Sequence, residues 1–252
     1  VKRAGVTKKD KLIEMGMLEN SVREALGDPS PRRMAVLKPL KVVLTNYPEE
    51  QVEMMEAKNH PGNDEMGTRE VPFSRELWIE QDDFMEDAPR KFFRLKPGGE
   101  VRLRFAYIMQ CDEVIKDDDG NVVELRCSYD PATRSGMPDS DRKVKGTIHW
   151  VSAAHAVDAE VRLYDRLFNV AKPNSAEDFH SVLNPGSLET VTAKLEPALG
   201  ESSDKAPVQF ERLGYFWPDS VDDAPEARVF NRIVTLRDSW AKIEKQAMQA
   251  ET

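Results

Sequence analysis

A series of short apolar runs, rich in Val, Leu, Ile and aromatic residues, begins at Met34 and continues almost to the end of the chain. The runs are MAVLKPLKVVL, ELWIE, EVRLRFAYIM, NVVELRCSY, KGTIHWVSA, AEVRLYDRLF, LETVTAKL, VQFERLGYF and RVFNRIVTL. Clusters of Gly, Pro, Asp and Asn separate them, as turns separate short strands. No run alternates with a long helical pattern, so the sequence disfavours a doubly wound nucleotide-binding fold. It predicts a mainly β fold in which antiparallel sheet closes into barrels.

Two other stretches indicate helix. Residues 7–26 carry apolar side chains at three- and four-residue intervals, namely Leu12, Met15, Leu18, Val22 and Leu26. Residues 27–31, GDPSP, then end this helix. Its single apolar stripe needs a partner surface, and packing on the following domain is favoured over a free interaction helix. Residues 240–250 indicate a short C-terminal helix.

The composition is that of an ordinary globular protein. With 252 residues, 40% of them hydrophobic and 32% charged, the chain can form one large or two modest domains. No apolar run is long enough to span a membrane, and the N-terminal VKRAGVTKKDK lacks the apolar core of a signal peptide. We therefore expect a cytoplasmic protein without a membrane partner.

The sequence shows no self-contained active site. Gly-rich phosphate loops, Ser-His-Asp elbows and metal-binding helix motifs are absent from it. The four histidines have no metal-ligand spacing, so no zinc site is expected. Paired acids such as Asp82-Asp83 and Asp222-Asp223 lie in hydrophilic runs and are interpreted as solvated surface.

Cys111 and Cys127 flank the turn signal DDDGN, which lies between two strand-like runs. In a hairpin centred on Asp119 they would lie opposite each other, where a disulfide is geometrically allowed. We expect reduced side chains, because disulfides are rare in the cytosol.

A basic segment stands out in a chain whose formal net charge is -9. Residues 90–104, RKFFRLKPGGEVRLR, follow the strongly acidic residues 48–87, so positive charge is concentrated here and points to a polyanion. Period-two alternation places Arg102 and Arg104 on one face of a strand, about 7 Å apart. Phe92 and Phe93 could stack on an unpaired base. The alternative is a solvated basic hairpin.

Three further stretches are interpreted as mostly irregular. Residues 47–87 have few periodic apolar positions and are expected to form loops with short elements. Residues 134–143 and 199–206 are expected to be polar loops.

Several blocks of the sequence resemble the C-terminal part of bacterial glutaminyl-tRNA synthetase. They are KRAGVTKKD, PRRMAV, NHP, EMGTREVPFS, EVRLR, YDPATRSG, KVKGTIHWVSAAHAV, EVRLYDRLF, VQFERLGYF and FNRIVTLRDSWAK. The resemblance covers essentially the whole chain, and KGTIHWVSAAHA and LYDRLF are its most specific blocks.

The resemblance implies two tandem antiparallel β-barrels, the distal one inserted in the proximal one, preceded by a short helical segment. Residues 1–28 would end a helical connector subdomain, residues 29–47 and 159–252 would form the proximal barrel, and residues 48–158 the distal barrel. It also implies a fragment without the catalytic domain, which in the parent ATP-dependent ligase binds ATP with Mg²⁺. The fragment should be inactive and hold no cofactor.

The implied partner is tRNA(Gln), chiefly its anticodon loop, bound by a monomer that has no DNA partner. By motif position the pocket for the central uridine would be formed by Arg32, Gln209, Arg212 and Ser239. Arg94 would meet the third base, while Arg102 and Arg104 would contact the first base and its phosphate. Phe93 departs from the family, which often has a basic residue there, and Ser239 replaces the usual threonine.

Alternatives remain at this stage. Arg33 could take the place of Arg32, Gln209 could cap a strand edge, and Lys143 and Lys145 are interpreted as phosphate or surface lysines outside the base site. The eukaryote- or archaeon-type glutamyl-tRNA synthetases have related barrels. A stand-alone barrel that binds ribosomal RNA or a protein is a further alternative.

Overall fold

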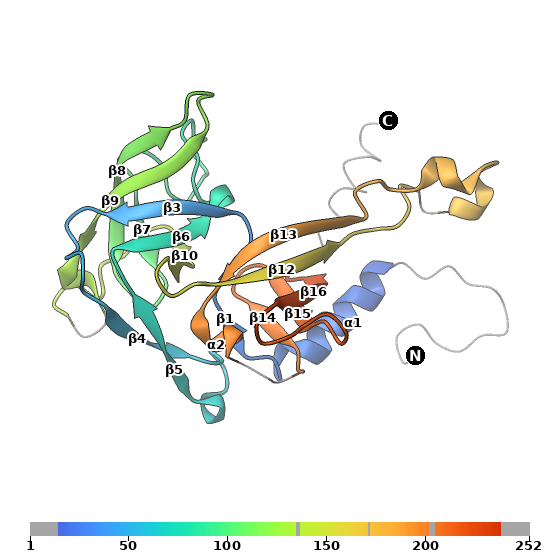
Figure 1. Cartoon of the computed structure of the whole chain (residues 1–252), viewed down its shortest axis with the longest axis horizontal. Coiled ribbons are helices and arrows are strands. Elements are labelled where there is room, and N and C mark those ends of the chain that lie inside the picture. The colour runs from blue at the N-terminus through green and yellow to red at the C-terminus, as the bar shows by residue number, and fades with distance from the viewer. Residues whose placement is uncertain (1–14, 135–136, 171, 202–204, 238–252) are drawn as a thin grey trace.

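The computed structural model describes residues 15–134, 137–170, 172–201 and 205–237, and over these residues the fold is mainly β, as predicted. Two seven-stranded sheets lie side by side, with a two-stranded hairpin below one of them (Figure 1). A single longer helix, α1 (Met15–Gly27), packs beside the first sheet, where Arg23 Nε donates to the carbonyl of Thr235 at 2.6 Å.

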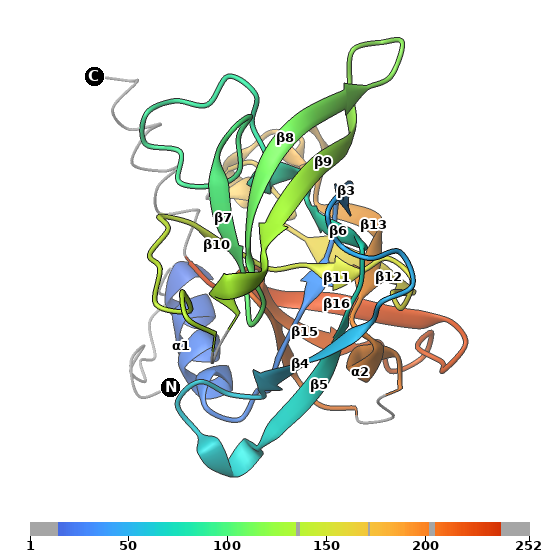
Figure 2. The same cartoon turned by 90° about the vertical axis from the view of Figure 1, so that its left-hand side faces the viewer.

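The first sheet contains, in spatial order, β1 (Arg32–Arg33), β14 (Val208–Phe210), β15 (Gly214–Pro218), β16 (Arg228–Thr235), β12 (Val157–Tyr164), β13 (Leu188–Leu195) and β2 (Ala35–Val36). The second sheet contains β10 (Thr147–Ile148), β7 (Glu100–Leu103), β8 (Ile108–Lys116), β9 (Val122–Asp130), β3 (Pro39–Leu44), β6 (Glu76–Glu80) and β11 (Val151–Ser152). The hairpin is β4 (Glu53–Lys58) with β5 (Thr68–Phe73), and it extends below the second sheet (Figure 2).

Short helical turns fill the connections. They are α2 (Pro197–Gly200) and the 3-10 turns η1 (Asp64–Met66), η2 (Gln81–Asp83), η3 (Pro131–Thr133), η4 (Pro173–Ser175) and η5 (Phe179–Val182). The turns η4 and η5 lie on an arm that continues the β12–β13 hairpin away from both sheets (Figure 1).

Each sheet curls back on itself because its two outermost strands are neighbours in the chain. Met34 alone joins β1 to β2, and His149-Trp150 joins β10 to β11. Closure of this kind removes the open edges that a flat sheet would expose. The barrel prediction is therefore confirmed, although each sheet also contains two parallel strand pairs and is not purely antiparallel.

Two hydrophobic cores lie inside the curled sheets. Phe73, Trp150 and neighbouring aromatic rings fill the second core, whereas Phe210, Phe216 and Phe230 pack in the first. The segment 34–37 is shared between them. Met34 and Val36 belong to the second core and Ala35 and Leu37 to the first, which follows from the period-two alternation of a strand.

Several local predictions are confirmed. The first helix ends at Gly27, and its expected beginning at residues 7–14 lies outside the described residues. Strand β13 coincides with LETVTAKL. Cys111 lies opposite Cys127 in the β8–β9 ladder, and both are buried and free. The helix expected at residues 240–250 also lies outside the described residues.

Other local predictions are wrong. Residues 47–75 are not mainly loops, because they contain β4 and β5, whereas β6 coincides with the expected run ELWIE. The runs VQFERLGYF and EVRLRFAYIM each form two strands, since Arg212 and Phe105 turn the chain with φ values of 68° and 65°. Strand β3 pairs with β6 and β9 of the second sheet, and the domain boundary at residue 47 stays a prediction.

Buried carboxylates connect the first sheet to the β4–β5 hairpin and to the second sheet. Glu196, which follows β13, pairs with Arg69 of β5, and its side chain is only 1% exposed. Asp83 of η2 pairs with Arg212, and Glu211 pairs with Arg104. The interpretation of the paired acids as solvated surface is therefore wrong for Asp83, whose side chain is buried. It is also wrong for Asp223 of the second pair, whose side chain is 8% exposed and forms an ion pair with Arg228.

Candidate nucleic-acid interface

Arg32 and Gln209 lie side by side because β1 and β14 pair in parallel with these two residues in register. The Arg32 guanidinium has only long contacts of 3.4 Å, to Tyr215 Oη, the Gly27 carbonyl and His60 Nε2. The Gln209 amide makes no hydrogen bond to any other described residue. These two side chains therefore keep donors and an acceptor available for a ligand.

Tyr215 was not expected from the sequence. It lies opposite Gln209 in the β14–β15 ladder and meets Arg32 through its hydroxyl. An aromatic residue in a strand is ordinarily part of a core. Nothing in the sequence around Tyr215 therefore indicates that its hydroxyl contacts Arg32.

Arg94 and Arg212 meet at one buried carboxylate. Asp83 accepts from both terminal nitrogens of Arg212, each at 2.6 Å, and lies 3.3 Å from Nε of Arg94. Arg94 also donates from Nη1 to the carbonyl of Asp82. Burial would lower the pKa of the Arg212 guanidinium, but the hydrogen bonds to Asp83 and the charges of Asp83, Glu80 and Glu211 together outweigh burial and raise that pKa. Arg212 therefore stays charged.

Arg104 reaches the same turn between β14 and β15. Its Nε donates to Glu211 Oε1 at 3.0 Å, and its guanidinium lies 4.8 Å from the centre of the Phe105 ring. Its backbone carbonyl accepts from Trp150 Nε1 at 2.9 Å, which ties this position to the second core. The Arg104 side chain remains 32% exposed, so its other nitrogens are accessible.

Arg102 has different contacts from the other arginines. Its terminal nitrogens donate to three backbone carbonyls, those of Thr133, Ser140 and Arg142, at 2.9 to 3.1 Å. The fork expected to face a ligand is thus used to hold the loop after η3. Sequence reasoning placed Arg102 and Arg104 on one face, but it could not reveal that this loop covers one of them.

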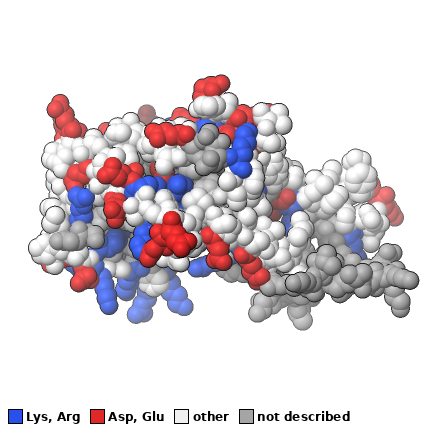
Figure 3. Space-filling view, turned by 90° about the horizontal axis from the view of Figure 1, so that it is seen from below, with Lys and Arg blue, Asp and Glu red and all other residues white. Residues whose placement is uncertain are grey.

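An exposed basic patch lies next to these arginines. It consists of Arg90, Lys91, Lys96, Lys143 and Lys145, and none of them forms an ion pair with another residue in the described ranges. Lys145 Nζ lies 5.5 Å from the ring centre of Phe93, whose side chain is 51% exposed. Figure 3 shows basic side chains projecting together at the left of the molecule, where the second sheet lies.

The structure thus brings Arg94, Arg104 and Arg212 to one turn. Gln209 lies on β14, which leads into that turn, and Arg32 lies beside it on the paired strand β1. Ser239 lies outside the described residues. Lys145, which the sequence placed outside the base site, stands beside Phe93 at the edge of the arginine group.

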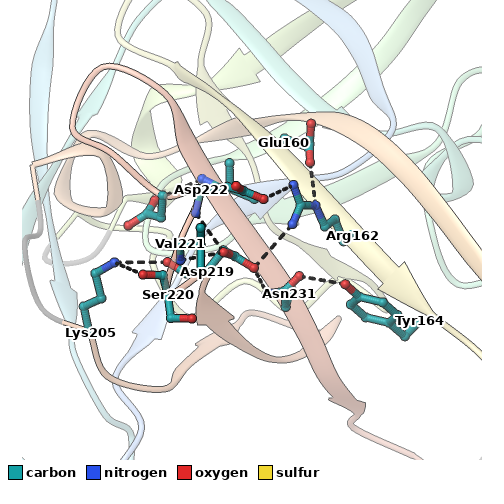
Figure 4. A network of polar contacts seen from close by, with 11 residues as sticks. Glu160, Arg162, Tyr164, Lys205, Asp219, Ser220, Val221, Asp222 and Asn231 are labelled. Atoms are coloured by element: carbon teal, nitrogen blue, oxygen red, sulfur yellow. Dashed lines mark hydrogen bonds and ion pairs between the residues drawn. The ribbon is translucent and has the colours of Figure 1, made fainter.

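A different polar network lies at the opposite end of β15 (Figure 4). Asp219 accepts from the backbone N–H groups of Val221 and Asp222 and from Asn231 Nδ2. Arg162 pairs with Asp219 and Asp222. Lys205 Nζ donates to the backbone carbonyls of Asp219 and Ser220, so the network fixes the β15–β16 loop.

Neither a metal centre nor a membrane span is found over the described residues. No three His, Cys, Asp or Glu side chains there could hold a metal ion together. None of the described helices is long and apolar enough to cross a bilayer.

Two family models match this chain, and both are described as the anti-codon binding domain of class I tRNA synthetases (E and Q). They match residues 30–130 and 147–219. The glutamine–tRNA ligase of Nitrobacter hamburgensis is 56% identical over 243 residues, which are 96% of this chain and 43% of that protein. That of Rhodopirellula baltica is 57% identical over 245 residues, 95% of this chain and 40% of that protein. The chain thus spans about two fifths of the length of these relatives.

Proposed function

The chain belongs to the anticodon-binding domains of the class I tRNA synthetases for glutamate and glutamine, and on that premise we propose that it reads the anticodon of tRNA(Gln) for a glutamine–tRNA ligase. The name of the relatives supports glutamine over glutamate as the amino acid. Recognition of a single-stranded loop requires donors and acceptors that reach unpaired base edges.

The proposal rests on one observation: arginines from both sheets meet at the β14–β15 turn. Beside them lies the basic patch, whose side chains form no ion pair with the described residues. Phosphate contacts position a nucleic acid, while contacts to base edges specify its sequence. The patch is suited to the first task, and the partly buried forks are suited to the second. No stand-alone catalytic constellation accompanies them in the described ranges.

We assign the central base to Arg32, Gln209 and Arg212, with Ser239 as the fourth member expected from its motif. Arg94, which shares Asp83 with Arg212, would meet the third base. Neighbouring bases would then be read by neighbouring side chains.

Arg104 would meet the first base and its phosphate, since only its Nε is engaged by Glu211. Arg102 would have to give up three carbonyl contacts to do so. We therefore assign Arg102 to the loop that carries Lys143, so that it supports phosphate contacts indirectly.

For the parent enzyme we propose ligation of glutamine to tRNA(Gln) driven by ATP. ATP with Mg²⁺ would be bound by the part of the parent that this chain does not match, since the chain covers 43% of the length of the Nitrobacter relative. The isolated chain, acting as a cytoplasmic monomer, should show neither aminoacylation nor ATP–pyrophosphate exchange, and exchange in a clean preparation would contradict this assignment.

The test is binding to RNA stem-loops that carry the glutamine anticodon or a single change at one of its positions. Base contacts of this kind discriminate by about 1 to 3 kcal/mol, or roughly 5- to 150-fold. Arg32→Ala should lose selectivity at the second position, and Arg94→Ala at the third.

Lys38→Ala serves as the control, because Lys38 is an exposed lysine paired with Glu189 outside the arginine group. It should leave all stem-loop affinities unchanged. If Arg32→Ala and Arg94→Ala weaken every stem-loop equally and keep the ranking of the unmodified protein, these arginines are phosphate clamps and the base assignment is wrong.

A further inference from the structure

Asp83 is a buried carboxylate shared by two arginines from different parts of the fold. Its side chain is 1% exposed, and it ends η2, directly after strand β6 of the second sheet. Arg212 comes from the β14–β15 turn of the first sheet, and Arg94 from the loop before β7. A carboxylate this deeply buried requires compensating positive charge, so it fixes the place of both guanidinium groups.

The contacts leave part of each guanidinium free. A guanidinium has five N–H groups in a fixed plane. Arg212 directs one hydrogen from each terminal nitrogen to Asp83, and Nη1 also lies 3.3 Å from His149 Nδ1. Arg94 uses Nε and Nη1, so its Nη2 makes no bond to any described residue. Both forks are thus anchored on one side and available on another.

Arg212 is held at both its backbone and its side chain. Its φ of 68° is a left-handed conformation that side chains other than glycine adopt only when the surrounding structure enforces it. The turn is closed by the bond from the Leu213 N–H to the Phe210 carbonyl at 3.0 Å. The bidentate pair with Asp83 then fixes the guanidinium, because a fork held by two parallel bonds has a fixed plane and direction. The direction in which Arg212 presents its remaining donors is therefore set by Asp83.

We propose that Asp83 is a shared positioning residue for the second and third anticodon bases, and that it couples discrimination at the two positions. This inference rests on the proposed function, in which Arg212 meets the second base and Arg94 the third. Adjacent bases of the anticodon loop would then be read by two guanidinium groups that are both paired with the Asp83 carboxylate. Moving that carboxylate disturbs both forks at once.

Asp83→Asn tests the inference, since it keeps the shape of the side chain and removes its charge. Selectivity in stem-loop binding should fall at the second and third positions together, by roughly tenfold each, and remain unchanged at the first. The matched control is Glu211→Gln, which removes the carboxylate partner of Arg104 and should affect the first position alone. A purely structural defect would weaken all stem-loops alike.

A second measurement needs no RNA and leaves Asp83 intact. Arg94→Ala, Arg212→Ala and the double variant form a cycle whose urea midpoints report whether the two arginines are coupled. Each single variant leaves Asp83 one partner and the double variant leaves none, so the double variant should lose more stability than the two single losses combined. Additive midpoint shifts would overturn the inference.

The outcomes separate the two proposals. If the unmodified protein does not discriminate among stem-loops, the proposed function fails, and the inference fails with it. If the unmodified protein discriminates but Asp83→Asn changes one position only, or all three equally, only the role of Asp83 is refuted.

Discussion

Replacing Glu196 with alanine should destabilise the protein by about 3 to 5 kcal/mol, the range for breaking a buried ion pair. The Glu196 side chain is 1% exposed and accepts from Arg69 Nη2 at 2.8 Å and from the backbone N–H of Met34 at 3.0 Å. Arg33 Nε lies 3.6 Å away. Without the carboxylate, Arg69, whose side chain is 8% exposed, keeps its charge but loses its buried counterion.

The assay is urea denaturation followed by circular dichroism. With a slope of about 3 kcal/mol per molar urea, the predicted loss lowers the midpoint by about 1 to 1.7 M. The control is Glu189→Ala in β13, whose partner Lys38 is 50% exposed. An exposed pair of this kind contributes about 0 to 1 kcal/mol.

Glu196→Gln should lie between these results, because the amide oxygen can still accept from Met34. A midpoint for Glu196→Ala that is no lower than that of Glu189→Ala would refute the idea that this buried pair holds the first sheet to the β4–β5 hairpin. An unchanged slope would show that the loss is one of stability and not of native compactness.

Three further predictions concern charge and thiols. Lys145→Ala should reduce the salt dependence of stem-loop binding by about one counterion and keep the ranking of the stem-loops, whereas Lys38→Ala should change neither. Hydrogen bonds from its own loop lower the pKa of Asp219 to about 2, so its contribution to stability is present above the unfolded pKa of about 4 and is lost as pH falls towards 2. The melting temperatures of the unmodified protein and Asp219→Asn should therefore converge over that interval; a constant gap would contradict the shift. Cys111 and Cys127 should react with a thiol reagent only after denaturation, since both are buried and the Cys111 thiol raises the pKa of Cys127.

Local patterns predicted much of the sheet structure. The alternation in LETVTAKL is that of one long strand, and Gly27 with the Pro residues that follow it ends the first helix, so both elements follow from sequence. The β4–β5 hairpin was not predicted, because β4 carries Glu and Lys on its outer face and only Met55 and Ala57 face the core. Arg212 and Phe105 turn the chain although neither is a glycine, so the sequence did not indicate that two strands are separated at each of these residues.

Site residues could be predicted from the sequence only where the residue type itself indicates a function. An arginine in a basic segment suggests an anion, and Arg94 and Arg104 do lie together with Arg212. No pattern shows that Asp83 is buried, because its partner Arg212 stands 129 positions later in the chain. The same holds for Arg102, whose carbonyl partners lie 31 to 40 positions away. Contacts of this range are set by how the sheets close.

The order of the strands in the chain determines which of the two sheets can fold first during synthesis on the ribosome. Every strand of the second sheet lies between Pro39 and Ser152, so that barrel can close while the ribosome is still adding the rest. The first sheet cannot, because Arg32 pairs with Gln209 and Ala35 with Leu195. Its two opening strands must therefore wait unpaired, at the base of an already folded barrel, for the last third of the chain. Such long-range pairing is slow, and until it occurs these strand edges are the part of the nascent protein that needs protection from aggregation.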